Sequence, residues 1–326
     1  MLPPEPSWRP TTAEYHSDRS HWSPSMLKTF RDSPERARAL YVGTEPLEAD
    51  DDEAGGEPDS EAGPAKKWLT NGSLVDLMLL TPELEATGVH VVQVASRSTK
   101  AFKQAQLDLG GGGCMVVTRP EYENARRAVG ALHARSTPAS LAARKLLAPI
   151  EPYGYSQWAG SGQHRGVPVK CMVDRLLDAD IITDLPPGKF DLVLADLKTA
   201  KDPSPSEFAR SAIKFGYPEQ AAFNRALVAA ACGTTPARVD VRLLVQRSSP
   251  PYEWAVYRLP PSWLDDAWRQ VDRELEVIGK CLAGELPWCA TWEAEELQEL
   301  VQPAWAKSPA AKKRSASRGV TSLYEE

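Results

Sequence analysis

Three charged residues could perform hydrolytic chemistry together: Asp174, Asp196 and Lys198. Both acids lie in runs, 167–177 and 190–197, that are too apolar for a strand facing solvent. Because successive side chains of a strand point to opposite faces, Asp196 and Lys198 share one face, and the residue between them points into the core. An acid on a neighbouring strand can meet them there. Two carboxylates can hold a hard divalent ion, and the lysine can orient a water or help to deprotonate it.

The Asp-x-Lys spacing also occurs by chance in many chains. It is then a solvated strand face or a surface ion pair that contributes little stability. Two features favour the functional interpretation here. The acids lie in apolar runs, and the lysine is followed by Thr199 and by a turn at Lys201-Asp202-Pro203.

A wider pattern resembles the PD-(D/E)XK nuclease superfamily, and more narrowly its RecE-type (exonuclease VIII-like) exodeoxyribonuclease domain. The residues that carry this resemblance are Asp174, Asp196-Leu197-Lys198-Thr199-Ala200, Phe208, Gly216-Tyr217 and Gln220. Supporting matches to the family pattern are Ser23-Pro24-Ser25-Met26-Leu27, Ser33-Pro34, Gly72 to Asp76, and Thr81-Pro82-Glu83. The resemblance runs from about residue 20 to about residue 260. Serine as N-cap with proline at the first helical position also predicts that helices start at Ser23-Pro24 and at Ser33-Pro34.

The resemblance implies an α/β fold with a PD-(D/E)XK restriction-endonuclease-like core, in which helices flank a central mixed sheet. It implies a Mg- or Mn-dependent enzyme that hydrolyses the phosphodiester bonds of double-stranded DNA from an end, 5′ to 3′, in recombination or repair. It also implies a homo-oligomer, ring-shaped in many relatives, and a single-strand annealing protein as a partner.

The resemblance also assigns roles to individual residues. The catalytic residues would be Asp174, Asp196, Lys198 and Gln220. The metal ligands would be Asp76, Asp174, Asp196, the carbonyl of Leu197, and Glu151. We expect DNA contacts from Tyr217, Lys201, Arg175 and Ser25. An alternative for Tyr217 and Gln220 is that they only cap the junction between two helices.

Asp76 departs from the family pattern, which usually has a metal-binding His at this position. Aspartate is a competent ligand for Mg or Mn, so the site could survive the change. The surrounding run, 66–80, is apolar nearly all round, and a lone Asp there is costly unless it is paired, protonated or bound to a metal. The alternative is a capping or ion-pair role with a nearby basic side chain.

Glu151 matches the family pattern less well than the other proposed metal ligands. Family members carry a Glu on the strand before a Ser or Thr and a Trp, but Glu151 lies well before Trp158, and the register is open. A Glu at the start of a strand, beside Pro152, is the alternative.

Composition excludes several classes of protein. The 326 residues are 42% hydrophobic and 25% charged, which is ordinary for a globular protein. No apolar run approaches the roughly 20 residues of a membrane helix, and the N-terminus has no apolar signal core, so we expect a cytoplasmic protein. The five cysteines form no C-x-x-C pair. This argues for free thiols and against an iron–sulfur cluster or a zinc site.

We expect one nuclease domain, 21–301, after a mobile N-terminus, 1–20. The net charge of −6 comes largely from an acidic run, and we expect a disordered insertion at 45–65. This segment could mimic DNA or could be a solvated linker. Residues 302–326 form a basic tail that we expect to be disordered. The tail could add salt-sensitive DNA affinity or could be inert.

Two other functions stay open. One is a RecB-like or repair endonuclease of the same fold, which would cut internal sites rather than digest ends. The other is a DNA-binding or assembly protein with a weakened site, suggested by Asp76 and by the negative net charge.

Overall fold

The structure is a computed structural model that describes residues 10, 12–43, 71–109, 114–148 and 153–289. The chain divides into two compact units, Met1–Trp288 and Cys289–Glu326, and every element below belongs to the first. The acidic insertion, the basic tail and Glu151 lie outside the described residues. Within those residues, no helix is both long and apolar enough to span a membrane.

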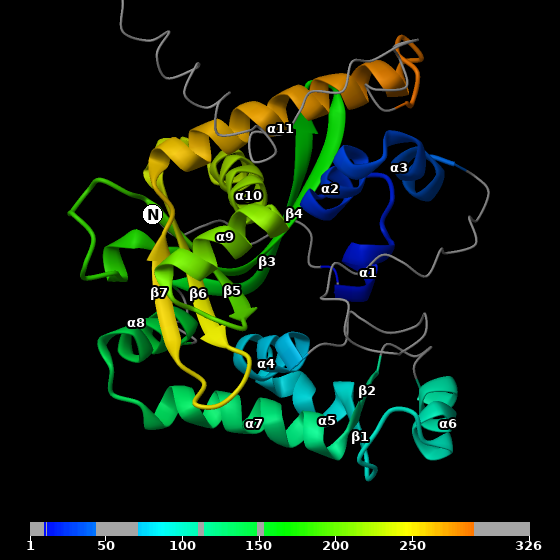
Figure 1. Ribbon diagram of the computed structural model, residues 1–326. Helices are drawn as coiled ribbons and strands as arrows, with labels where there is room; N and C mark the ends of the chain where they lie inside the picture. Colours follow the sequence, from blue (N-terminus) through cyan, green and yellow to red (C-terminus); the bar gives the residue numbers. More distant parts are fainter. Residues whose placement is uncertain (1–9, 11, 44–70, 110–113, 149–152, 290–326) are drawn as a thin grey trace, which may run out of the picture. The chain divides into compact units, whose positions relative to one another are not determined.

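A five-stranded mixed sheet organises the first unit (Figure 1). Its order is β3-β4-β5-β6-β7, in which only the β5–β6 pair is parallel. The strands are β3 (Gly154–His164), β4 (Val167–Asp178), β5 (Leu192–Ala200), β6 (Val239–Arg247) and β7 (Trp254–Arg258). The mixed sheet agrees with the α/β class expected from the sequence.

Helices cover both faces of this sheet, and β5 shows why. Leu192 and Leu194 belong to one core, whereas Val193, Ala195 and Leu197 belong to the other, as the two-residue period of a strand requires. The first core is shared with α2 (Pro24–Asp32), α9 (Pro205–Phe215), α10 (Tyr217–Ala231) and α11 (Pro261–Leu282). The second is shared with α4 (Asn71–Leu80), α7 (Arg119–Ala134) and α8 (Pro138–Leu147).

A smaller parallel sheet adjoins α7. It pairs β1 (Val89–Val92) with β2 (Met115–Thr118). The short segments η1 (Pro82–Leu84) and α5 (Glu85–Gly88) precede it, and α6 (Lys100–Leu109) connects its two strands. Three further short 3-10 and helical elements are η3 (Ala179–Ile181), η4 (Pro236–Arg238) and α3 (Pro34–Tyr41).

The N-terminal segment, within residues 12–22, packs against the main sheet. Residues 12–17 form α1 (Thr12–Ser17), and Tyr15 is buried. The ammonium of Lys170 donates to the carbonyl of Tyr15 at 2.5 Å and lies 3.4 Å from the Asp18 carboxylate. Trp22 pairs with β4, because its N–H donates to the carbonyl of Pro168 at 2.8 Å. The segment is therefore held on the edge of β4 that β5 leaves free, a requirement that the local sequence does not reveal.

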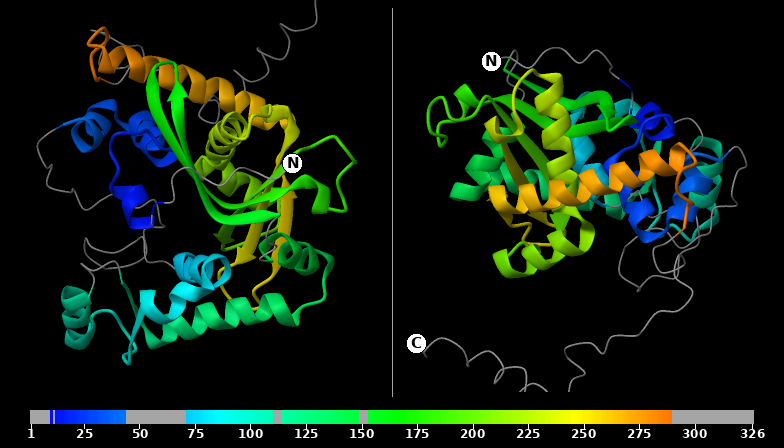
Figure 2. Two further views of the ribbon diagram at one scale, coloured as in Figure 1. Left: turned by 180° about the vertical axis from the view of Figure 1, so that it is seen from behind. Right: turned by 90° about the horizontal axis from the view of Figure 1, so that it is seen from above.

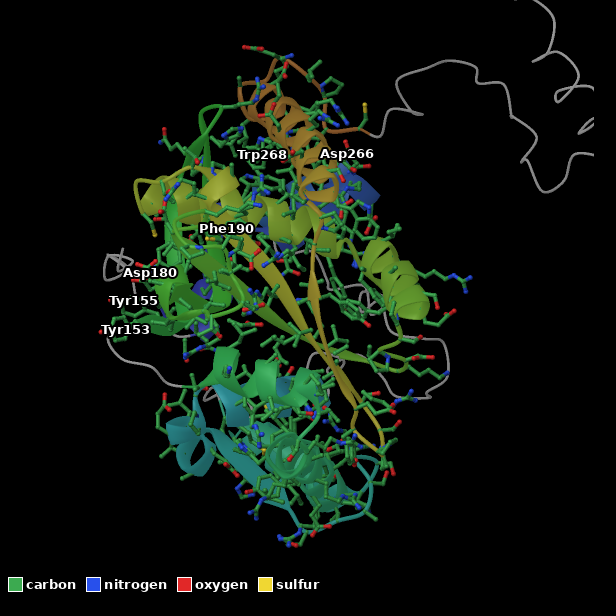
Figure 3. The ribbon with its side chains drawn as sticks, turned by 90° about the vertical axis from the view of Figure 1, so that its left-hand side faces the viewer. Tyr153, Tyr155, Asp180, Phe190, Asp266 and Trp268 are labelled. Atoms are coloured by element: carbon green, nitrogen blue, oxygen red, sulfur yellow. The ribbon has the colours of Figure 1, made fainter. Side chains whose placement is uncertain are left out.

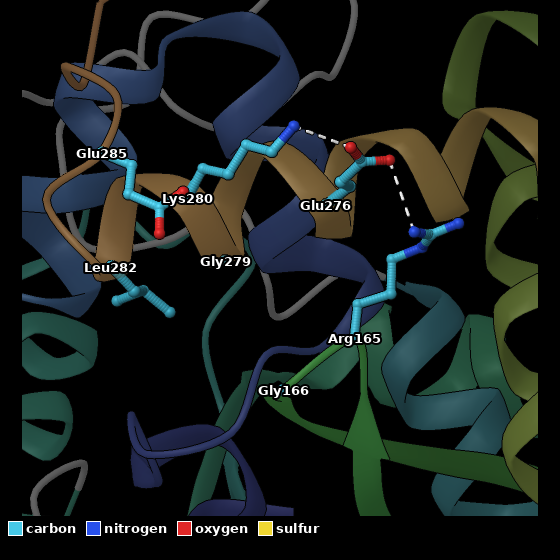
Figure 4. A pocket seen from close by; sticks show the side chains of 7 residues that line it. All are labelled: Arg165, Gly166, Glu276, Gly279, Lys280, Leu282 and Glu285. Atoms are coloured by element: carbon cyan, nitrogen blue, oxygen red, sulfur yellow. Dashed lines mark hydrogen bonds and ion pairs between the residues drawn. The ribbon is translucent and has the colours of Figure 1, made fainter.

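The long β3–β4 hairpin reaches α11 (Figure 2). At its turn, Arg165 pairs with Asp272 at 2.6 Å and lies 3.4 Å from Glu276, which also pairs with Lys280 at 2.8 Å. Arg165, Glu276 and Lys280 border a cavity of about 400 Å³, which Glu285 also lines (Figure 4). The ion pairs of Arg165 join the hairpin to the helix.

Candidate active site

The two strands that carry the acids separate at the acids themselves. β4 pairs with β5 from Asp178↔Leu192 to Arg175↔Ala195, and the next pair in this register would be Asp174 with Asp196. That pair does not form. The carboxylate of Asp174 instead accepts a hydrogen bond from the backbone N–H of Leu197 at 2.6 Å. Where β4 and β5 diverge, the Asp174 side chain thus takes the place of the backbone hydrogen bonds between the two strands.

The hydrogen bond from the Leu197 N–H to Asp174 also shows how the backbone of Leu197 is oriented. The N–H and C=O of one strand residue point to the same edge of the strand, so the Leu197 carbonyl lies on the edge of β5 that faces Asp174. The Leu197 side chain is buried in the second core, as expected. Asp196 and Lys198 lie on the other face, next to α10.

Lys198 is held from three sides. Its ammonium lies 2.5 Å from the Asp196 carboxylate and donates to the Gln220 side-chain oxygen at 3.2 Å. It also lies over the Tyr217 ring, 4.9 Å from its centroid. Burial alone would lower the pKa of Lys198, but the charges of Asp196 and Asp174 outweigh it and hold that pKa above its ordinary value. The lysine is therefore charged.

Tyr217 and Gln220 come from the start of α10 and lie three residues apart, so they share one face of its first turn. Gly216 ends α9 and begins α10 with φ +71°, a conformation that favours glycine. The Gly-Tyr-x-x-Gln spacing therefore brings a turn, an aromatic ring and an amide to Lys198. The alternative role, capping the junction of two helices, concerns the same residues. Tyr217 and Gln220 lie at the junction of α9 and α10 and also contact Lys198.

Asp76 approaches from the opposite layer, on α4. Burial first, and then the charge of Asp174, raise the pKa of Asp76 well above its ordinary value. The pKa of Asp174 rises to about 7, mainly through burial and then through the charge of Asp196. The structure therefore places Asp76, Asp174 and Asp196 in one electrostatic neighbourhood with Lys198.

The donor chemistry of this neighbourhood fits a hard divalent cation. Carboxylates and a backbone carbonyl are the ligands that Mg²⁺ and Mn²⁺ prefer. A cation would also offset the burial and the repulsion between acids that raise the pKa of Asp76 and of Asp174. In the present side-chain arrangement, the described residues contain no group of three His, Cys, Asp or Glu side chains that could hold a metal ion. Asp196 instead pairs with Lys198, and Asp174 with the Leu197 N–H.

The residues expected to contact DNA lie in different places. Tyr217 lies beneath Lys198, and Lys201 is exposed just after β5. Ser25 is also exposed, but it borders a separate cavity of about 130 Å³ near Lys170.

Arg175 does not fit the expected role. It is only 2% exposed, and its guanidinium donates to the Leu146 and Ala148 carbonyls at the end of α8 and to the Ser156 hydroxyl. Burial lowers its pKa. Its side chain therefore lies on the α8 side of β4. The residue therefore anchors α8, and it is not placed to contact a phosphate.

The sequence-based reasoning did not single out Gln157. Ser156 pairs with Arg175 and Trp158 with Val173, which leaves Gln157 opposite Asp174, with φ +46°. Counting residue pairs back from the hairpin turn at His164–Val167 would have identified this position, because register follows from the turn. Gln157 is half-buried.

Comparisons with known proteins bear on the fold. No protein-family model matches the sequence, and no curated protein matches it. The structure is similar to the crystal structure of a "Putative exonuclease" from Eubacterium rectale, with 14% sequence identity and a TM-score of 0.50. The alignment covers 91% of this chain and 97% of the other. At this identity the similarity concerns the fold alone, which is a mixed α/β fold.

Proposed function

We propose that the chain is a metal-dependent exodeoxyribonuclease that hydrolyses phosphodiester bonds of double-stranded DNA from an end. One observation carries the proposal: Lys198, ion-paired with Asp196, lies beside Asp174 where β4 and β5 separate. The similarity of its fold to the crystal structure from Eubacterium rectale supports it. An acid pair with a charged lysine suits hydrolysis of an anionic ester.

The divalent ion, Mg or Mn, would be held by Asp174 and Asp196, with Asp76 and the Leu197 carbonyl. When bound, it neutralises the phosphate and lowers the pKa of the attacking water. Lys198 is held charged and so has no lone pair with which to accept a proton. Its role is to donate hydrogen bonds to the attacking water and to stabilise negative charge that develops on the phosphate oxygens. Gln220 fixes the direction of its ammonium.

The finer parts of the proposal rest on the resemblance to RecE-type enzymes. These are the 5′-to-3′ direction, a role in recombination or repair, assembly as a homo-oligomer, and a single-strand annealing protein as a partner. Cytoplasmic location belongs to the same set of proposals.

The test compares linear and closed-circular duplex DNA, with Mg and with Mn, for the wild type and for Lys198→Met and Asp196→Asn. We expect loss of linear DNA only, abolished in both variants. Cutting of circles would replace the proposal with an endonuclease of the same fold. Binding of DNA without hydrolysis of either form would favour a protein with a weakened site, and Asp76→His would then test whether the family ligand restores activity.

A further inference from the structure

Arg31, on α2, carries a guanidinium that is held by α11 and lies beside the start of α10. The three helices pack against one another (Figure 1). The guanidinium donates from Nε to Oε1 of Glu274 at 2.7 Å and from Nη2 to Oε2 at 3.0 Å. Gln270, one turn earlier on α11, donates to the same carboxylate at 3.0 Å and so fixes its direction. Two parallel hydrogen bonds of this kind hold a guanidinium in one orientation.

The third nitrogen of Arg31, Nη1, lies at the junction of α9 and α10. A Cβ atom at Gly216 would lie 3.7 Å from this nitrogen and 3.7 Å from Oε2 of Glu219. That Glu219 oxygen is buried and has no hydrogen-bond partner among the described residues. Burial alone would lower the pKa of Arg31, but the hydrogen bonds and charge of Glu274, and then the charge of Glu219, raise it. Arg31 therefore balances two carboxylates that belong to different helices.

Glu219 lies between the two residues of α10 that contact Lys198. Tyr217 precedes it by two positions and Gln220 follows it directly, all within the first turn of the helix. The carbonyl of Gly216 accepts a hydrogen bond from the Gln220 N–H at 3.0 Å, so these two residues belong to one hydrogen-bonded turn. A shift of this turn would change the distance from the Gln220 side chain to the Lys198 ammonium, which is 3.2 Å.

We propose that Arg31 is a positioning residue for the candidate site, because it fixes the first turn of α10 against α11 and thereby holds Tyr217 and Gln220 in place. The inference rests on the proposed function, since it names a residue that acts on the same site without touching the DNA. The alternative is that Arg31 only joins α2 to α11 and contributes to stability alone. The two roles differ in what happens to α10 when the guanidinium is removed.

Arg165 offers a matched control on the same helix. Its guanidinium also forms two hydrogen bonds with one carboxylate of α11, that of Asp272, at 2.7 and 2.6 Å. One turn earlier, Trp268, labelled on α11 in Figure 3, packs against His164 with ring centroids 5.0 Å apart. Arg165 therefore joins the β3–β4 hairpin to α11, whereas Arg31 joins α2 to α11 beside the start of α10.

The test compares Arg31→Met with Arg165→Met by amide hydrogen exchange in EDTA, so that this readout needs no hydrolysis. The measured quantity is the exchange rate of the Gln220 amide relative to the amides of β6, because amides in a core strand report global unfolding. We expect this ratio to rise about tenfold in Arg31→Met and to keep its wild-type value in Arg165→Met. Glu274→Gln, which keeps the shape of the side chain but removes its charge, should raise the ratio about threefold. It decides the matter if Arg31→Met does not fold.

A second readout separates positioning from stability where the wild type hydrolyses DNA. Arg31→Met should then lower kcat about tenfold at an unchanged KM, and Arg165→Met should leave both constants unchanged. A wild-type exchange ratio in Arg31→Met would overturn the proposal, as would an unchanged kcat in that variant or an equal rise of the ratio in Arg165→Met. The nuclease function is judged separately. A wild type that hydrolyses nothing but shows the selective rise in exchange would reject the nuclease and keep Arg31 as the residue that fixes the start of α10.

Discussion

Replacing Asp174 with asparagine tests whether the fold holds its acids together at a cost in stability. Asparagine has nearly the same shape and keeps an oxygen for the Leu197 N–H, 2.6 Å away, so the substitution removes mainly the charge. Burial, together with the charge of Asp196, raises the pKa of Asp174 to about 7. An acid with a raised pKa destabilises the native state as the pH rises above its ordinary pKa, because only the unfolded chain then ionises, and the effect reaches its full size above the raised pKa.

The size of the effect follows from this pKa. At pH 8, the difference between about 7 and the ordinary value of 3.8 corresponds to about 4 kcal/mol. Asp174 is half-buried, and solvent screening reduces the expected gain to about 2 kcal/mol. In EDTA, Asp174→Asn should therefore unfold at higher urea concentration than the wild type, and it should have lost DNA hydrolysis.

Asp191→Asn is the matched control. It is the same substitution at a position where the carboxylate charge stabilises the folded state. Hydrogen bonds from Arg238 and Thr234 hold the pKa of Asp191 down to about 2. This variant should be less stable than the wild type. Urea unfolding of the three proteins at pH 8 decides the matter. If Asp174→Asn is destabilised as Asp191→Asn is, the acids are not held under mutual repulsion, and the electrostatic argument for a cation site is refuted.

Three further predictions concern other parts of the chain. Arg175→Met should lower thermal stability while DNA affinity per folded molecule, measured by anisotropy, stays unchanged; a selective loss of affinity would restore its role in DNA contact. Gly216→Ala should cost about 1 kcal/mol of stability, because φ is +71° there, and should lower kcat by displacing Tyr217 and Gln220. Unchanged kcat would refute that positioning. Hydrogen bonds from Arg165 hold the pKa of Asp272 down to about 2. Its contribution to stability is therefore present above about pH 4 and is lost as the pH falls toward 2, so Asp272→Asn should flatten the acid limb of a thermal-stability profile. If the loss of thermal stability at low pH is the same in Asp272→Asn as in the wild type, other carboxyl groups cause the acid unfolding.

The sequence predicted those parts of the site that depend on local periodicity. The two-residue period of a strand was enough to place Asp196 and Lys198 on one face and Leu197 on the other. The Ser-Pro pairs also marked the starts of α2 and α3, where Ser23 and Ser33 accept backbone hydrogen bonds as N-caps. In both cases the determining interactions lie within a few residues of each other.

The remaining features depend on pairing between distant segments. Arg175 was expected to contact DNA, yet its side chain is 2% exposed and donates to carbonyls at the end of α8, a segment distant in the sequence. The order of residues 12–22 depends on a free edge of β4, which exists only because β5 diverges after Ala195. The position of Gln157 opposite Asp174 follows only from the register of the β3–β4 hairpin. Neither the free edge nor that register can be read from one segment alone.

The central claim is that Asp196 and Lys198, beside Asp174, form the hydrolytic centre of a nuclease. The most direct test measures nucleotide release from end-labelled linear duplex DNA with Mg, for the wild type and for Lys198→Met. Urea unfolding should first establish that both proteins are folded. We predict release by the wild type and a loss of at least about a hundredfold in Lys198→Met, since one preorganised charge at a transition state contributes on that order. Equal release by both folded proteins would contradict the account.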